Sequence, residues 1–152
     1  MDTYTVEDLI PHRGKMRLID KILDINPTEK SLISQVTITK QDTFFDPTIG
    51  GVPAYVSFEY MAQSISALSS LMNNRQAPKQ GVILSVSNLS CTKNIFLENS
   101  EIHIQVKEDC EEGEILTFDG IASIKGEIIV SCTLMVMEVD ALKTLTKRKE
   151  VK

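Results

Sequence analysis

The sequence places one carboxylate where charge is otherwise absent, because Glu59 is the only charged residue between Asp46 and Arg75. The stretch around it is apolar or small on nearly every helical face, and such a helix is usually buried. Burial disfavours a charged carboxylate, and chains rarely keep one without a use for it. Glu59 is therefore a candidate catalytic group. The alternative is that it caps the helix, pairs with a strand residue or reaches solvent.

Two histidines, His12 and His103, are the imidazoles available to exchange a proton near neutral pH. His12 follows Pro11, which restrains its backbone, and it lies beside Arg13 and Lys15. It is a candidate base, and the alternative is that its ring bonds a backbone carbonyl. His103 lies within an alternating strand pattern, which predicts an exposed or interface position.

A glycine-rich approach precedes the uncharged stretch and reads Gly50, Gly51, Val52 and Pro53. Proline suits the first turn of a helix. Backbone N–H groups at a helix N-terminus carry the positive end of the dipole and could polarise a carbonyl oxygen. The alternative is that the two glycines merely make a tight turn. Gln63, one turn after Glu59, shares its helix face and could orient the carboxylate or a water.

Composition excludes several classes of protein. The formal net charge of −5 and the lack of a basic stripe interleaved with aromatics argue against nucleic-acid binding. The acidic N-terminus is no signal peptide, and no apolar run approaches the roughly 18 residues of a membrane span. Three widely spaced cysteines fit a reducing cytoplasm, and two histidines add too few ligands to predict a metal site.

The length of 152 residues predicts one domain, residues 1–152, with residues 143–152 as a frayed tail. The patterns predict a short helical turn (5–10), a hairpin (18–25 and 32–39), a long helix (about 53–73), a turn (75–81) and four strands (82–91, 101–110, 115–124 and 128–139). This order favours an α+β fold, in which an antiparallel sheet curls around one apolar helix.

Three stretches of the chain resemble the 3-hydroxyacyl-(acyl-carrier-protein) dehydratases. Residues 10–22 are similar to the family's Leu-Pro-His-Arg opening and to its first strand with an internal Asp. Glu59-Tyr60-Met61-Ala62-Gln63 is similar to the Glu-x-Met-Ala-Gln that starts the family's central helix. Phe44-Phe45 before a Gly/Pro-rich loop matches the approach to that helix. The resemblance implies the hotdog fold, a long central helix wrapped by an antiparallel sheet.

One departure concerns the catalytic histidine, which the family carries in a His-Phe-Pro-Gly loop before the helix. The matching residues 46–53 contain no histidine, so the chain resembles a divergent branch of the family. His12 is then the natural substitute base beside Glu59. Two alternatives stay open: a non-catalytic acyl-binding subunit that pairs with a catalytic hotdog partner, and a thioesterase in which Glu59 activates water.

The resemblance further implies dehydration of a carrier-linked 3-hydroxyacyl thioester to a trans-2-enoyl thioester, in fatty-acid or polyene-type acyl-chain synthesis. The expected catalytic residues are Glu59 and His12, and the expected substrate-binding residues are Gly50, Gly51, Val52, Gln63 and Arg13. No cofactor is expected, because the substrate rides on the phosphopantetheine of acyl carrier protein. The expected partners are that carrier and a second hotdog chain, in a homodimer, a larger homo-oligomer or a heterodimer.

Overall fold

A computed structural model of the chain describes residues 5–72 and 81–138. The expected tail at 143–152 and most of the expected turn at 75–81 lie outside these residues. The elements are α1 (Val6–Leu9), η1 (Gly14–Met16), β1 (Lys21–Asn26), β2 (Ser31–Thr37), β3 (Gly51–Pro53), η2 (Ala54–Val56), α2 (Ser57–Met72), β4 (Gly81–Cys91), β5 (Ile95–Leu97), β6 (Glu101–Glu112), β7 (Ile115–Ile124) and β8 (Glu127–Glu138).

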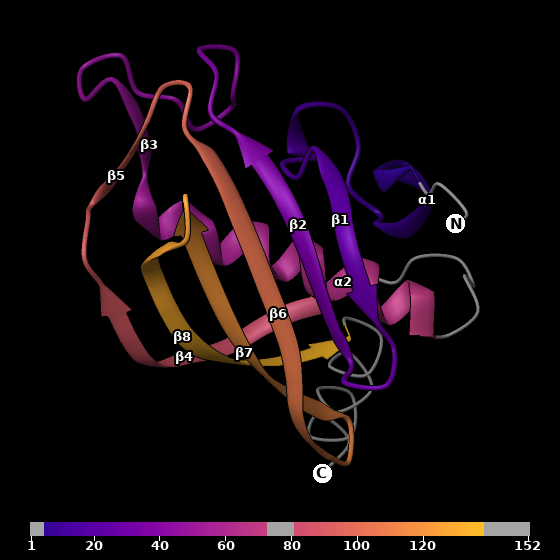
Figure 1. Cartoon of the computed structure of the whole chain (residues 1–152). Coiled ribbons are helices and arrows are strands. Elements are labelled where there is room, and N and C mark those ends of the chain that lie inside the picture. Colours follow the sequence, from indigo (N-terminus) through magenta and orange to yellow (C-terminus); the bar gives the residue numbers. More distant parts are fainter. Residues whose placement is uncertain (1–4, 73–80, 139–152) are drawn as a thin grey trace, which may run out of the picture.

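One antiparallel sheet of six strands, in the order β1-β2-β6-β7-β8-β4, curves across the helix α2 (Figure 1). The strands β3 and β5 form a separate two-stranded ribbon that leads into the helix. Along β6 the residues alternate between exposed and buried, so Ile102, Ile104 and Val106 face the core with none of their surface exposed. The expected α+β fold, a helix wrapped by an antiparallel sheet, is confirmed.

Serines on α2 form buried hydrogen bonds where the helix packs against the sheet. Ser64 lies on the buried side of α2, and its Oγ is 2.7 Å from the Oγ of Ser34 on β2. The Ser64 hydroxyl also donates to the Tyr60 carbonyl oxygen at 2.8 Å. Each buried hydroxyl thus has a partner, which removes most of the cost of burying it.

The predicted strands match the observed ones except at the N-terminal end. Residues 18–20 are not in a strand, since β1 begins at Lys21. The backbone N–H of Asp20 donates to the Gln35 carbonyl oxygen, but those of Leu18 and Ile19 bond the side chain of Gln63. The short strands β3 and β5 were not predicted, because three residues are too few to give a periodic signal.

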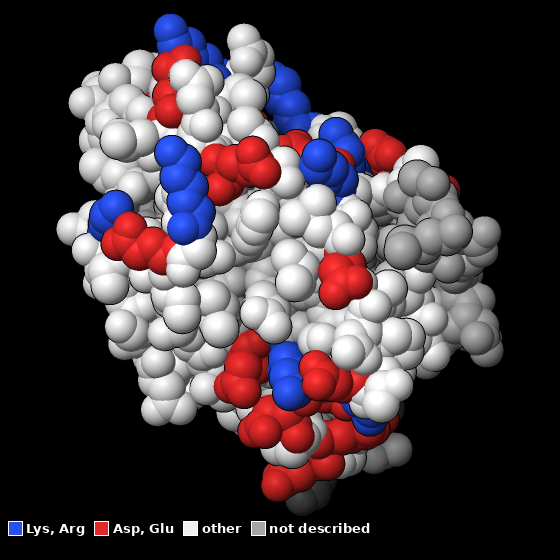
Figure 2. Space-filling model, in the orientation of Figure 1, with Lys and Arg blue, Asp and Glu red and all other residues white. Residues whose placement is uncertain are grey.

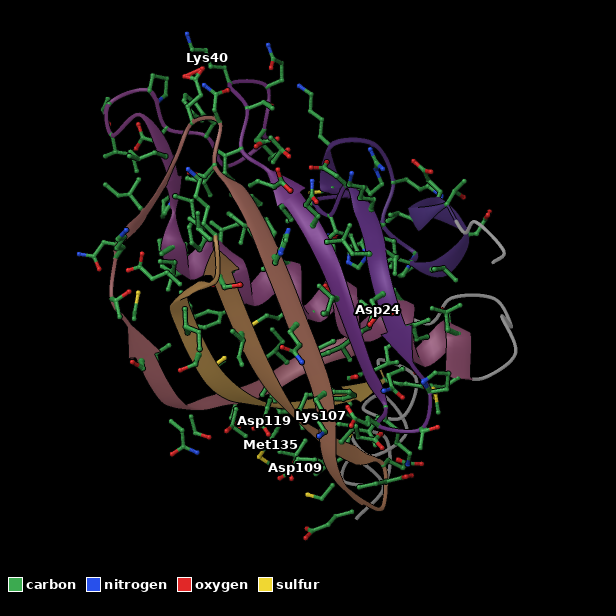
Figure 3. The ribbon with its side chains drawn as sticks, in the orientation of Figure 1. Asp24, Lys40, Lys107, Asp109, Asp119 and Met135 are labelled. Atoms are coloured by element: carbon green, nitrogen blue, oxygen red, sulfur yellow. The ribbon has the colours of Figure 1, made fainter. Side chains whose placement is uncertain are left out.

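The outer surface of the sheet is polar and its charges are grouped. Lys107, Asp109 and Asp119 lie near one another at the lower end of the sheet in Figure 3, and Lys107 is directly opposite Asp119 in the β6–β7 pair. In Figure 2, Asp and Glu gather at the lower end of the molecule, over the β6–β7 hairpin, whereas the lower left flank shows almost no charge. Within the described ranges, no helix is long and apolar enough to cross a membrane.

Gly51 is required where β3 meets β5. A Cβ at Gly51 would lie 2.1 Å from the Phe96 carbonyl oxygen, so Gly51→Ala must separate the two strands. We expect the free energy of unfolding, measured in urea, to fall by about 1–3 kcal/mol. The control is Gly81→Ala, because a Cβ there meets only the Met137 carbonyl oxygen, at 3.7 Å. Equal stabilities of the two variants would contradict this reading of the contact.

Candidate functional site

His12 lies in an irregular segment between α1 and η1 and is half-buried. Its Nδ1 is buried and has no hydrogen-bond partner in the part of the chain that the structure describes. Burial lowers the pKa of His12 from its ordinary value of 6.5, although Glu59 acts to raise it and Arg13 adds to the lowering. The fold therefore favours a neutral imidazole, which can accept a proton at neutral pH.

Glu59 lies in the first turn of α2, close enough for its charge to act on His12. The expectation that Glu59 is buried is wrong for the single chain, because the residue is exposed. The sheet covers the opposite side of the helix, where Tyr60 and Met61 are buried. Four residues spaced three or four apart, Glu59, Ala62, Ser66 and Ser69, lie on one face of α2. Three of them are at least partly exposed, Ser66 being the buried one.

Gln63 is 1% exposed, and its amide is used by the segment that follows His12. Its Oε1 accepts hydrogen bonds from the backbone N–H groups of Leu18 at 2.8 Å and Ile19 at 3.3 Å. Its Nε2 donates to the Met16 carbonyl oxygen at 2.6 Å. We had expected Gln63 to orient Glu59 or a water, but the structure gives its amide these backbone partners instead.

The loop before the helix closes tightly on Asp46. The backbone N–H groups of Gly50 and Gly51 both point to the Asp46 carbonyl oxygen, at 3.0 Å and 3.4 Å. The Asp46 carboxylate accepts from the N–H and hydroxyl of Thr48, which lowers its pKa. Val52 is fully buried in β3. The N–H groups of Gly50 and Gly51 thus already have an acceptor. A backbone donor to a substrate carbonyl would therefore have to come from a residue after the glycines, where the helical residues begin.

Arg13 is exposed and secures its own segment. Its Nη1 donates to the carbonyl oxygens of Ile10 at 2.6 Å and His12 at 2.8 Å. Arg17 lies 3.4 Å from a Glu7 carboxylate oxygen, while Lys15 is exposed. Arg13, Lys15 and Arg17 thus form a basic group in the sequence, of which Arg13 and Arg17 are partly engaged within the chain.

A cavity of about 280 Å³ lies along the same helix face as Glu59. From α2 it is lined by Ala62, Ile65, Ser66 and Ser69, and from the sheet by Val82, Ile83, Leu116, Val136 and Met137. Three carboxylates, those of Glu111, Glu114 and Glu138, also line it. Sequence reasoning missed this cavity. The signal was the small residues at positions 62, 66 and 69, which leave space on a face that bulky side chains would fill.

Comparison with known proteins adds a direct assignment. Residues 4–147 match the model of the ApeP-like family, described as ApeP dehydratase. The chain belongs to the ApeP-like dehydratase family. Family membership confirms the dehydratase-type resemblance that the His12 and Glu59 motifs indicated.

Within the described ranges, no group of three His, Cys, Asp or Glu side chains could hold a metal ion.

Relatives of this ApeP-like chain include dehydratases of known name. It is 29% identical to the 3-hydroxyacyl-(acyl-carrier-protein) dehydratase FabZ of Shewanella oneidensis over 89% of this chain and 90% of that protein. The structure of the dehydratase heterocomplex ApeI:P from Xenorhabdus doucetiae matches with a TM-score of 0.84 and 22% identity, over 95% of this chain and 99% of that one. A hypothetical thioesterase protein from Streptococcus pneumoniae, solved with coenzyme A, matches with a TM-score of 0.60 and 11% identity, over 78% of this chain and 84% of that one. These structures share the hotdog fold.

The lowered pKa of His12 predicts how stability depends on pH. Because the folded chain favours the neutral ring, this contribution is complete above the ordinary value of 6.5 and is lost as the pH falls toward the folded pKa. We expect the free energy of unfolding in urea to be lower at about pH 5.5 than at about pH 7.5. His12→Gln should reduce that difference, and the matched control is His103→Gln at an exposed position. An unchanged difference in His12→Gln would refute the assignment.

Proposed function

We propose that this ApeP-like chain dehydrates a 3-hydroxyacyl thioester, carried on acyl carrier protein, to a trans-2-enoyl thioester during acyl-chain synthesis. The family match and the FabZ relatives support the reaction class. The observation that carries the assignment of the site is the unpartnered, buried Nδ1 of His12 within the electrostatic influence of Glu59. A buried polar atom without a partner is rare and marks a place where a ligand can complete the hydrogen bonding.

The proposed chemistry moves two protons and releases water. His12, neutral because burial lowers its pKa, removes the proton from C2 of the acyl chain. The Glu59 carboxyl, which is exposed in the single chain and which the proposed partner chain would enclose, acts as the acid. It delivers a proton to the leaving 3-hydroxyl group, which departs as water while the C2–C3 double bond forms. Backbone N–H groups in the first turn, at Tyr55 and Val56, are the candidates to polarise the thioester carbonyl. These proton transfers call for neither a redox cofactor nor a metal.

The acyl chain is proposed to occupy the cavity beside α2. The α2 residues that line the cavity run from Ala62 to Ser69, about 4.5 Å to 15 Å beyond Glu59 along the helix axis, so the cavity extends away from the reacting carbons. Its aliphatic residues from β4, β7 and β8 suit a hydrocarbon chain, and the helix serines leave it room. This arrangement places the thioester at Glu59 and the tail farther along the same helix face.

Acyl carrier protein is proposed to dock near the basic group Arg13, Lys15 and Arg17. Positive side chains attract a phosphopantetheine phosphate and an acidic carrier. The named relatives are dehydratases of carrier-bound substrates, which supports this partner. We also propose a cytoplasmic location, since Cys91 and Cys110 are free and exposed, as expected in a reducing compartment.

A second hotdog chain is proposed to pair along β4. This strand ends the sheet, carries no charged residue, and exposes Leu84 (40%) and Leu89 (55%). A long edge strand without charges is a template for pairing with another strand. Such a partner would bring a second surface toward the uncovered face of α2 and could enclose Glu59.

A heterodimer is the second candidate arrangement. The exposure of Glu59 and the absence of the loop histidine leave room for a partner to contribute catalytic groups. The ApeI:P structure is by its own name a heterocomplex, which supports this alternative. In that case this chain supplies part of the site or binds the acyl chain alone.

Substitution of the proposed acid and base tests the function. We expect Glu59→Gln and His12→Ala each to lower the rate of enoyl formation from a 3-hydroxyacyl-carrier substrate by about 10²–10⁴-fold. His103→Ala, on the outer face of the sheet, is the control and should retain the wild-type rate.

The same assay separates the rival functions. A full rate in His12→Ala would show that His12 is not the base. Release of free thiol without enoyl product would favour a thioesterase. Activity that appears only after a second hotdog protein is added would favour the heterodimer.

A charge on β4 should prevent pairing along that edge. We expect Leu89→Lys to weaken dimer formation by about tenfold or more, because pairing would bury the new charge. Light scattering across a concentration series measures the mass, and Leu23→Lys is the control, because Leu23 is 41% exposed on the opposite edge strand, β1. Equal effects of both variants would exclude β4 as the interface. A wild-type chain that stays monomeric alone would point to a different partner chain, to be tested with the same two variants.

A further inference from the structure

The segment that carries His12 is attached to α2 at both of its ends. On the N-terminal side, the Ser70 hydroxyl donates to the Leu9 carbonyl oxygen at 2.7 Å. On the C-terminal side, Gln63 bonds the backbone at Met16, Leu18 and Ile19. The two side chains lie two helical turns apart on one face of α2, so a single rigid element holds both ends.

These side-chain hydrogen bonds take the place of backbone pairing with a neighbouring strand, which the segment lacks. Regular pairing with β2 starts only at Asp20, whose N–H donates to the Gln35 carbonyl oxygen at 2.8 Å. Before that point, η1 provides only the short-range bonds Met16 to Arg13 and Arg17 to Gly14. Ile19 is fully buried, so its N–H group would be left without water or partner if Gln63 were removed. The Thr43 hydroxyl also bonds this part of the segment, at the Lys15 carbonyl oxygen, but Gln63 is the α2 side chain that holds it to the helix.

The same helix also carries the carboxylate. Gln63 is four residues after Glu59, and side chains at this spacing are neighbours on a helix. The imidazole and the carboxylate come from separate parts of the chain, and Gln63 bonds those parts together close to Glu59, whereas Ser70 bonds them farther along the helix. Small errors in the separation of two reacting groups cost large factors in rate.

We propose that Gln63 is a positioning residue that fixes the His12 imidazole relative to Glu59, with Ser70 holding the other end of the segment. This inference rests on the proposed function of His12 and Glu59. It replaces direct substrate binding by Gln63, whose buried amide bonds three backbone groups. The effect of Gln63 on the reaction is therefore indirect, through the placement of His12.

The test compares Gln63→Leu, which keeps the size of the side chain and removes its hydrogen bonds, with Ser64→Ala. Ser64 is buried on the same helix and bonds Ser34 and Tyr60, but it does not touch the segment. Ser64→Ala therefore controls for a general loss of stability. Ser70→Ala is the second variant and releases only the Leu9 end, should Gln63→Leu fail to fold.

Two readouts need no substrate. We expect Gln63→Leu to speed hydrogen exchange at the amides of Leu18 and Ile19 by about tenfold or more, beyond any change in Ser64→Ala. We also expect the NMR titration midpoint of His12 to move toward its ordinary value of 6.5, because a loosened segment exposes the ring. Glu59 and Arg13 are the charged groups that act on this ring, and neither is changed by the substitution.

The kinetic readout follows the same comparison. We expect kcat of Gln63→Leu to fall by about tenfold or more with KM changed by less than about threefold, and Ser70→Ala to show the same pattern more weakly. An unchanged His12 midpoint, or a kcat no lower than that of Ser64→Ala, would overturn the positioning role. Failure of the proposed function is recognised separately, by a full rate in His12→Ala while the exchange and titration effects of Gln63→Leu persist.

Discussion

The burial of α2 against the concave side of the sheet is the constraint on which the rest of the molecule depends. The helix has residues such as Met61, Ala67 and Leu68 with almost no exposed surface, and the strands β2, β6, β7 and β8 supply their neighbours. A helix packed in this way cannot shift without opening the core, since interiors are as dense as organic crystals. The helix α2 is therefore a rigid element. The β3–β5 ribbon, the segment that carries His12 and the cavity are all arranged along it.

Polar side chains on this helix form hydrogen bonds in two places, to the sheet and to the segment that precedes β1. Ser64 faces the sheet and closes a hydrogen bond across the core to Ser34. Gln63 and Ser70 face the other way and bond backbone groups of the segment that precedes β1. The helix thus lacks a polar face because its polar atoms are used internally, not because it is merely apolar. This explains why serine is so frequent in a stretch that reads as buried.

Much of the fold could be predicted from the sequence, and less of the site. Alternation located β2 and β6, because side chains of a strand point to its two faces in turn. The runs between turn residues located β4, β7 and β8. The ribbon β3–β5 was missed, since it rests on the close approach of Gly51 to Phe96, which no pattern encodes. The pairing of His12 with Glu59 was predicted from motifs. The exposure of Glu59 was not, because it depends on which side of α2 the sheet covers.

In the proposed mechanism the base does not come from the loop before the helix, because residues 46–53 contain no histidine. The loop 46–51 is closed by hydrogen bonds to one carbonyl oxygen, that of Asp46, and passes directly into β3. These hydrogen bonds fix the backbone of the loop, so the loop is not free to bring a side chain over the helix. The imidazole comes instead from the segment that the helix holds through Gln63, so the position of the reacting group is maintained by side-chain bonds.

The uncharged edge of β4 has a consequence for how the chain is made. Between synthesis and assembly, this edge is open to any strand that it meets, including β4 of another copy in a wrong register. Correct pairing and aggregation then compete, and aggregation gains as the concentration of unassembled chain rises. The supply of the correct partner therefore sets how much of this protein a cell can keep in usable form. In the proposed heterodimer, balanced production of the two chains would be as much a condition for activity as the proposed acid and base.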